Sequence, residues 1–168
     1  FISESDNTQK EFLADIKIYF CKVCKVVQTL HDVEVVDYYE DYQYTVGNSK
    51  KAKAFMKEIA HNLVNLFPHD KQIKVLEIGS GDGGQLLEFK NIGCDVLGFE
   101  PSENLTQMAL SKGIKSVKGL FNEETVKNLP SNNSKFNIVF LSYTFDHLPE
   151  PKTFLNTVSK ILDLNDGL

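Results

Sequence analysis

The segment Val75-Leu-Glu-Ile-Gly-Ser-Gly-Asp-Gly-Gly84 decides how the rest of the chain is interpreted. An apolar run leads into a turn that is dense in glycine, and Gln85–Asn91 behind it has the pattern of a short helix. Because glycine has no Cβ atom, such a turn lets a ligand lie close against the backbone. The N-terminus of the following helix adds free N–H groups and a partial positive charge. The segment therefore predicts a ligand-binding strand, turn and helix.

Strand and helix patterns alternate on both sides of this turn. We expect strands at 74–78, 95–100, 116–118 and 136–141, and helices at 85–91, 102–112, 122–128 and 153–162. This alternation predicts an α/β fold, a Rossmann-like, doubly wound parallel sheet of about four strands. An apolar fourth strand at an open edge is unfavourable, so we expect a truncated sheet and hence a fragment of a longer protein.

Three acidic residues accompany the glycine turn. Glu77 lies two residues before the first glycine, Asp82 lies within the turn, and Glu100 ends the second predicted strand. Carboxylates beside a pyrophosphate would cost about 1 kcal/mol or more for each close pair. They suit a ligand with an ammonium group and no phosphate, such as S-adenosylmethionine. Glu100 stands where this kind of fold holds a ribose diol, with charge-assisted hydrogen bonds of about 1.5–3 kcal/mol each.

Other interpretations of the same residues stay open. Gly79-x-Gly81-x-x-Gly84 also matches the dinucleotide fingerprint, which favours an NAD(P)-dependent oxidoreductase domain. Glu100 does not choose between these cofactors, because each of them carries a ribose. A non-catalytic regulator that binds cofactor is a further alternative, and a tight turn without any ligand is the simplest.

Several segments together resemble the class I S-adenosylmethionine-dependent methyltransferases. Val75–Gly84 with Glu100 is similar to their first two motifs, and Phe136–Ser142 is similar to their fourth-strand motif. Phe145–Pro151 resembles the His-Leu-Pro-acid-Pro run of many members that act on small molecules. The resemblance covers about Gln72 to Leu162 and implies methyl transfer from S-adenosylmethionine to a small-molecule acceptor.

The resemblance also implies which residues contact each part of the cofactor. They are Glu77, Gly79 and Gly81 for the methionine part, Glu100 for the ribose, Leu120 and Phe121 for the adenine, and Leu141, Ser142 and Tyr143 near the methyl group. The neighbouring turn residues that complete the expected set are Ser80, Asp82, Gly83 and Pro101. His147 follows the fourth strand and is the candidate catalytic base, although a loop histidine that only bonds the backbone fits equally well.

The front of the chain has a different character. Cys21-x-x-Cys24 and the residues behind it are similar to the zinc-ribbon module of sugar C-methyltransferases. The similarity implies a structural zinc ion, which takes four ligands, whereas one cysteine pair is present here; a first pair is then expected upstream of Phe1. We therefore expect a partial zinc-ribbon-like segment at 1–46, a connecting helix at 47–70 and the N-terminal half of a methyltransferase domain at 71–168. A sugar or nucleotide-sugar carbon or oxygen becomes the candidate methyl acceptor.

The composition argues against a nucleic-acid-binding protein, a membrane-spanning protein and a disulfide scaffold. The 168 residues contain 18 basic and 23 acidic side chains, a net charge of −5, and every basic one is lysine. Without arginine the chain lacks the planar forks that recognise guanine and phosphate, so no nucleic-acid partner is expected. No stretch has the length and apolarity of a membrane span, and three cysteines do not make a disulfide scaffold. The expected location is the cytoplasm.

Overall fold

The computed structural model describes residues 16–29, 45, 49–130, 135–163 and 165–168. The chain divides into two compact units, Phe1–Val35 and Val36–Leu168. In the first unit, strands β1 (Ile18–Phe20) and β2 (Val27–Thr29) pair antiparallel, with Ile18 opposite Thr29. The turn between them contains Cys21 and Cys24, so the cysteine pair lies at the tip of a hairpin.

The second unit is built on a parallel sheet. Its strands are β3 (Lys74–Ile78), β4 (Asp95–Glu100), β5 (Ser116–Lys118) and β6 (Ile138–Leu141), in the order β5-β4-β3-β6. All three pairings are parallel, which confirms the predicted α/β Rossmann-like sheet. Glu77 of β3 lies opposite Gly98 of β4, so the carboxyl ends of these strands meet at one edge of the sheet.

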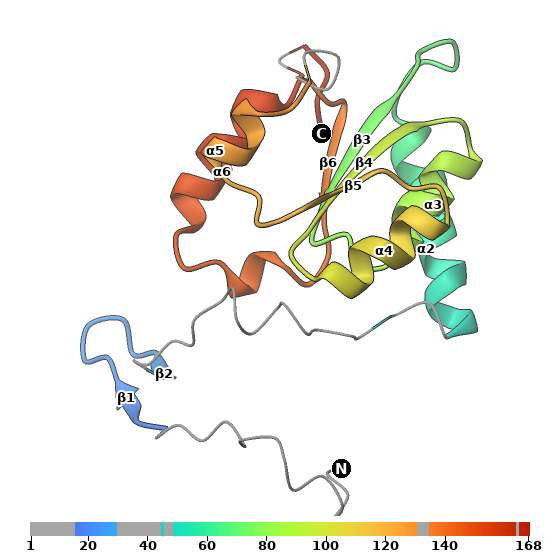
Figure 1. Cartoon of the computed structure of the whole chain (residues 1–168). Coiled ribbons are helices and arrows are strands. Elements are labelled where there is room, and N and C mark those ends of the chain that lie inside the picture. The colour runs from blue at the N-terminus through green and yellow to red at the C-terminus, as the bar shows by residue number, and fades with distance from the viewer. Residues whose placement is uncertain (1–15, 30–44, 46–48, 131–134, 164) are drawn as a thin grey trace, which may run out of the picture. The chain divides into compact units, whose positions relative to one another are not determined.

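Helices cover both faces of this sheet (Figure 1). One face packs against α2 (Lys50–Val64), α3 (Gly84–Asn91) and α4 (Glu103–Ser111), and the other against α5 (Glu123–Lys127) and α6 (Pro151–Ile161). The alternation of side chains along β3 explains the two layers, because successive residues point to opposite faces. Val75 joins the core that contains Ala60 and Phe89, whereas Leu76 joins the core that contains Phe154 and Ile161.

Local signals in the sequence explain where the helices start. Ser49 accepts a hydrogen bond from the Ala52 N–H at 3.3 Å and caps α2. Ser102 caps α4 in the same way, and Asn122 forms a reciprocal capping box with Thr125 at the start of α5. Pro151 occupies the first turn of α6, where its missing N–H costs no hydrogen bond.

The outer edge of β6 is partly occupied by the last residue of the chain. The Val139 N–H donates to the Leu168 carbonyl at 2.9 Å, and the Leu168 N–H donates to the Asn137 carbonyl at 2.8 Å. Leu168 thus bonds to the residues on either side of Ile138, which is the hydrogen-bond pattern of parallel strands. Within the described ranges, no helix is both long and apolar enough to cross a membrane.

Candidate active site

Glu77 is the most unusual side chain at the carboxyl edge of the sheet. It is 4% exposed, and its Oε2 atom has no hydrogen-bond partner among the described residues. Burial raises the pKa of this carboxyl well above its ordinary value, and the nearby acids Asp82 and Glu100 raise it further. A buried carboxyl oxygen without a partner is costly to a folded protein, so the site suits a ligand that supplies a donor.

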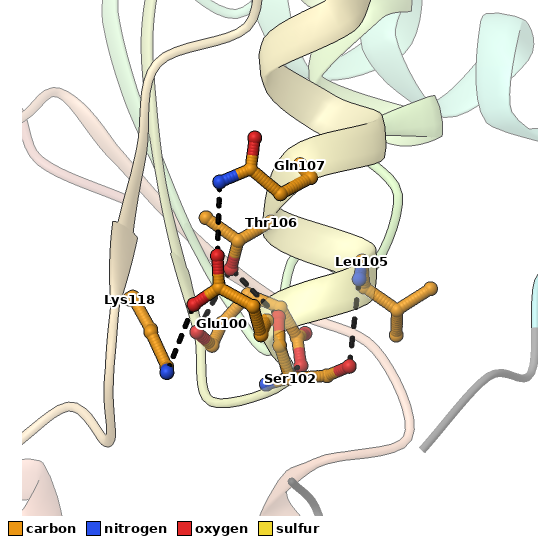
Figure 2. Close-up of polar contacts among 7 residues, drawn as sticks. Glu100, Ser102, Leu105, Thr106, Gln107 and Lys118 are labelled. Atoms are coloured by element: carbon orange, nitrogen blue, oxygen red, sulfur yellow. Dashed lines mark hydrogen bonds and ion pairs between the residues drawn. The ribbon is translucent and has the colours of Figure 1, made fainter. Parts of the chain in front are cut away.

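Glu100 joins the ends of two loops. One carboxylate oxygen accepts the Gly81 N–H at 2.8 Å, and the other accepts the Ser102 N–H at 2.9 Å. Figure 2 shows Glu100 beside Ser102 and Thr106 at the start of α4, where the Thr106 hydroxyl also donates to the Glu100 carbonyl at 3.2 Å. Burial raises the pKa of Glu100, and the two N–H donors oppose that shift. Glu100 therefore fixes the glycine turn to the second strand.

Asp82 is paired with a lysine that lies far along the chain. Lys112 Nζ lies 2.6 Å from the Asp82 carboxylate and donates to the Asp82 carbonyl at 2.9 Å. The other carboxylate oxygen accepts the Gly84 N–H at 3.2 Å. The structure thus places a cation beside the glycine turn, where the sequence pattern indicates only acidic residues.

The glycines of the turn differ in what surrounds them. A Cβ atom at Gly83 would lie 3.0 Å from the Ala109 side chain, and one at Gly79 would collide with the Thr144 hydroxyl, so packing accounts for both glycines. At Gly81, where φ is +53°, a Cβ atom would meet nothing within 4 Å. Space beside the backbone is therefore open at Gly81, where a ligand could approach.

Two other residues predicted to contact the cofactor lie beside these loops. Ser80 is buried, and a side chain at Gly98 would collide with its hydroxyl. Pro101 is half-buried between Glu100 and the Ser102 cap. Ser80 follows the end of β3, and Pro101 follows the end of β4. Their contacts with a cofactor stay predictions.

The residues predicted to lie near the methyl group, at the end of β6, differ in how exposed they are. Leu141 is half-buried, Ser142 is exposed, and Tyr143 is 89% exposed with φ of +54°. His147 belongs to a short 3-10 helix, η3 (Phe145–His147), and its Nε2 atom lies 3.7 Å from the Asp146 carboxylate. Its side chain is 57% exposed, so His147 is open to an acceptor and also to water.

The two residues predicted to flank the adenine do not share one environment. Leu120 is 38% exposed, whereas Phe121 is buried. The Phe121 ring packs edge-on against Phe99 at 5.4 Å and against Phe154 at 5.3 Å, measured between ring centroids. Leu120 is thus accessible to a ligand, while most of Phe121 belongs to the core under α6.

The cysteine pair forms a tight knuckle. The Cys24 N–H donates to the Cys21 sulfur at 3.5 Å, and Lys25 follows with φ of +63°. The N–H of Cys24 lowers the pKa of the Cys21 thiol. No group of three or more histidine, cysteine, aspartate or glutamate side chains in the described ranges is arranged to hold a metal ion. The described residues therefore do not support the predicted zinc-binding module.

A cavity of about 250 Å³ lies between α5 and α6. It is lined by residues of those two helices and the loop after α5, namely Glu123, Val126, Lys127, Leu129, Thr157, Lys160 and Ile161. None of the residues predicted to bind cofactor lines it. We therefore place the candidate site at the carboxyl edge of the sheet, where the buried acids meet.

Sequence reasoning missed two residues of this edge. Lys112 gives no local signal, because its pairing with Asp82 joins positions 30 residues apart. Thr144 packs beside Gly79, and its hydroxyl lies 3.3 Å from the Ile78 carbonyl. Lys112 is the C-cap of α4, and a lysine at a helix C-terminus usually indicates only a favourable interaction with the helix dipole.

Comparison with known proteins adds to this geometry. A family model described as a methyltransferase domain matches residues 51–168, more than half of the chain. The chain is 24% identical to the C-methyltransferase NovU of Streptomyces niveus over 167 residues, and 31% identical to an uncharacterized methyltransferase of Bacillus pumilus over 120 residues. These alignments include 99% and 70% of this chain, but 40% and 51% of the relatives' own lengths.

Among solved structures, the plantazolicin methyltransferase BpumL in complex with SAH has a similar fold. It aligns with a TM-score of 0.52 at 19% identity, over 66% of this chain and 43% of that one. At this level of identity the likeness concerns the fold alone.

Proposed function

Because the chain belongs to the methyltransferase domain family, we propose that the carboxyl edge of its sheet binds S-adenosylmethionine for transfer of its methyl group to a small molecule. The main observation in support is Glu77, a buried carboxyl with one oxygen that accepts no hydrogen bond from the part of the chain that the structure describes. The ammonium group of an amino acid brings three N–H donors and a positive charge. A pyrophosphate would instead bring negative charge next to Glu77 and Glu100.

The residues of the edge have separate tasks in this proposal. Glu77 holds the ammonium group, and the open space at Gly81 admits the methionine part. Each carboxylate oxygen of Glu100 already accepts one N–H but keeps a further lone pair, which leaves an acceptor for each ribose hydroxyl. When bound, the cofactor supplies a methyl group on a positively charged sulfur, so this chain needs mainly to orient the reactants and exclude water.

Calorimetric titration tests the cofactor assignment and its main alternative together. We expect saturable binding of S-adenosylhomocysteine and none of NADH, whereas the reverse would establish the oxidoreductase alternative. Glu77→Ala should weaken S-adenosylhomocysteine binding by about tenfold or more, the loss of a hydrogen bond to a charged group. Glu124→Ala is a matched control, because Glu124 is an exposed acid of α5 outside the site. Binding without turnover on any acceptor would indicate the non-catalytic regulator.

For the acceptor, we propose a carbon atom of a sugar or nucleotide sugar. The relative that aligns with nearly the whole chain is named a C-methyltransferase, and the resemblance of the front segment to sugar C-methyltransferases agrees with it. A carbon beside a ketone needs a base to remove its proton, and His147 is accessible for this task. With such an acceptor, His147→Ala should lower kcat about a hundredfold and leave cofactor affinity unchanged; His69→Ala, at another exposed histidine, should change neither.

For the front segment, we propose that Cys21 and Cys24 supply two of the four ligands of a structural zinc ion. The hairpin brings both cysteines into one turn, and an N–H donor to a sulfur stabilises its thiolate form. In a protein that also contains the second cysteine pair implied by the resemblance, metal analysis should find close to one zinc per chain, lost in Cys21→Ser and Cys24→Ser but retained in Cys94→Ser. Absence of zinc from that protein without substitutions would refute this assignment.

A further inference from the structure

Lys112 is a surface lysine with an unusually specific set of contacts. It caps the C-terminus of α4, and its ammonium group reaches both the carbonyl and the carboxylate of Asp82. The Asp82 side chain is 13% exposed, so the pair is shielded from water more than an ordinary surface ion pair. One helix end therefore fixes the position and the charge of the loop beside Glu77.

The charge of Asp82 matters because it raises the pKa of Glu77. After burial itself, the negative charge of Asp82 raises the pKa of Glu77 most, and the charge of Glu100 on β4 raises it further. The register partners of Glu77 are Gly98 on β4 and Phe140 on β6, neither of which ionises. Lys112 thus acts on Glu77 indirectly, since its positive charge offsets the negative charge of Asp82.

We propose that Glu77 gives up one proton when the ammonium group of the cofactor binds, and that Lys112 is a positioning residue that sets, through Asp82, the pH range of this exchange. The inference rests on the proposed function, because it needs an ammonium group at Glu77. The balance is simple: the protonated carboxyl releases H⁺ to the solvent, and the carboxylate that remains pairs with the ammonium group. No bond of the cofactor changes.

The direction of the pH dependence follows from this exchange. Burial and the charges of Asp82 and Glu100 raise the pKa of Glu77, so the ligand-free protein keeps this proton above the ordinary range of a carboxyl. Below that pKa, ligand binding competes with the proton, and affinity should rise about tenfold for each pH unit. Above it, affinity should be constant until the pH at which the ammonium group of the ligand loses its own proton. Removal of the Lys112 charge leaves Asp82 unneutralised, which should move the rise in affinity to higher pH.

The experiment is calorimetric titration of the complete chain with S-adenosylhomocysteine between pH 5.5 and 9. Pairs of buffers with different ionisation enthalpies give the number of protons released on binding. We expect about one proton per ligand on the acidic side of the profile, and none for Glu77→Gln, which has no proton to lose. Thermal unfolding of this variant without ligand shows whether it is folded.

Lys112→Met and Lys112→Arg test the second half of the inference. Lys112→Met should shift the midpoint of the affinity profile upward by about one pH unit, with recovery of affinity at high pH, and Lys112→Arg should restore the original profile. An equal loss of affinity at every pH would mean that Lys112 only supports the loop, and would overturn its role. Tight binding without proton release would overturn the exchange at Glu77 but leave the cofactor assignment intact. Failure of the unmodified protein to bind S-adenosylhomocysteine would overturn both.

Discussion

The hydroxyl of Thr144 lies where a side chain at Gly79 would have to stand. It belongs to the loop after β6, and it lies 3.3 Å from the Ile78 carbonyl at the end of β3. Gly79 itself has φ of +72°. The loop that follows the fourth strand is therefore packed directly on the glycine turn that follows the first strand of the sheet, and the position of one depends on the other.

Gly79→Ala should therefore destabilise the protein more than a left-handed glycine alone explains. Adoption of positive φ by alanine costs about 1–2 kcal/mol, and displacement of Thr144 adds about 1–3 kcal/mol of overpacking. Gly93→Ala is the matched control, because Gly93 has φ of +93° and open space where its Cβ atom would be. Chemical denaturation of both variants measures the difference, and equal losses of unfolding free energy would contradict the steric relationship.

Glu77→Gln should alter the pH dependence of stability in the ligand-free protein. The ordinary pKa of this carboxyl is 4.5, and burial raises it well above that value in the folded state. Between the two values the unfolded chain loses the proton while the folded chain retains it, so the stability contributed by Glu77 is complete below about pH 4.5 and is lost as pH rises through the folded-state pKa.

Glutamine has no proton to lose, so the melting temperature of Glu77→Gln relative to the unmodified protein should increase as pH is raised from 5 to 8. Differential scanning calorimetry without ligand measures this trend. Glu124→Gln, at an exposed acid, should show no such trend. A difference that stays constant with pH, or that falls, would show that Glu77 is ionised in the folded protein.

The buried strands of the sheet could be predicted well from the sequence. The bounds of β3, β4 and β5 agree with the predicted ranges. For β3 and β4 the reason is a short, largely buried run limited by a turn. The fourth strand begins two residues later than predicted. Phe136 instead forms an isolated bridge with Leu162, and the Asn137 side chain accepts the Lys74 N–H at 2.9 Å.

The location of Glu77 and Glu100 at one edge of the sheet could also be predicted, since the carboxyl ends of neighbouring parallel strands share that edge. The pairing of Asp82 with a cation could not be predicted. Its charge is offset by Lys112, and a contact between a loop and a distant helix end leaves no trace in local periodicity. The sequence also could not show that Phe121 is mostly part of the core, because an aromatic residue suits a core and a ligand pocket equally.

Glu100→Gln should show whether Glu100 only stabilises the two loops through its hydrogen bonds or also binds the ribose. A glutamine amide has one oxygen, so its NH₂ group must face the N–H of either Gly81 or Ser102 and leave a donor unsatisfied. We expect a loss of about 1–3 kcal/mol in unfolding free energy without ligand and a loss of S-adenosylhomocysteine affinity of about tenfold or more.

The neighbouring Glu103→Gln is the control, because Glu103 is about half exposed and pairs with Lys118 at 2.9 Å outside the turn. Such an exposed ion pair contributes little to stability. If Glu100→Gln lowered stability but left ligand affinity unchanged, Glu100 would be a structural tie between the two loops and the ribose assignment would be wrong.

Leu120→Ala should mainly weaken ligand binding, whereas Phe121→Ala should mainly lower stability. Leu120 is partly exposed, so its truncation should cost less than about 1 kcal/mol in unfolding free energy but should weaken S-adenosylhomocysteine binding if it flanks the adenine. Phe121 packs against Phe99 and Phe154, and its truncation should cost about 3–5 kcal/mol. Denaturant titration with and without ligand measures both quantities. Unchanged affinity in Leu120→Ala would remove this loop from the adenine site, because Leu120 is the more accessible of the two side chains.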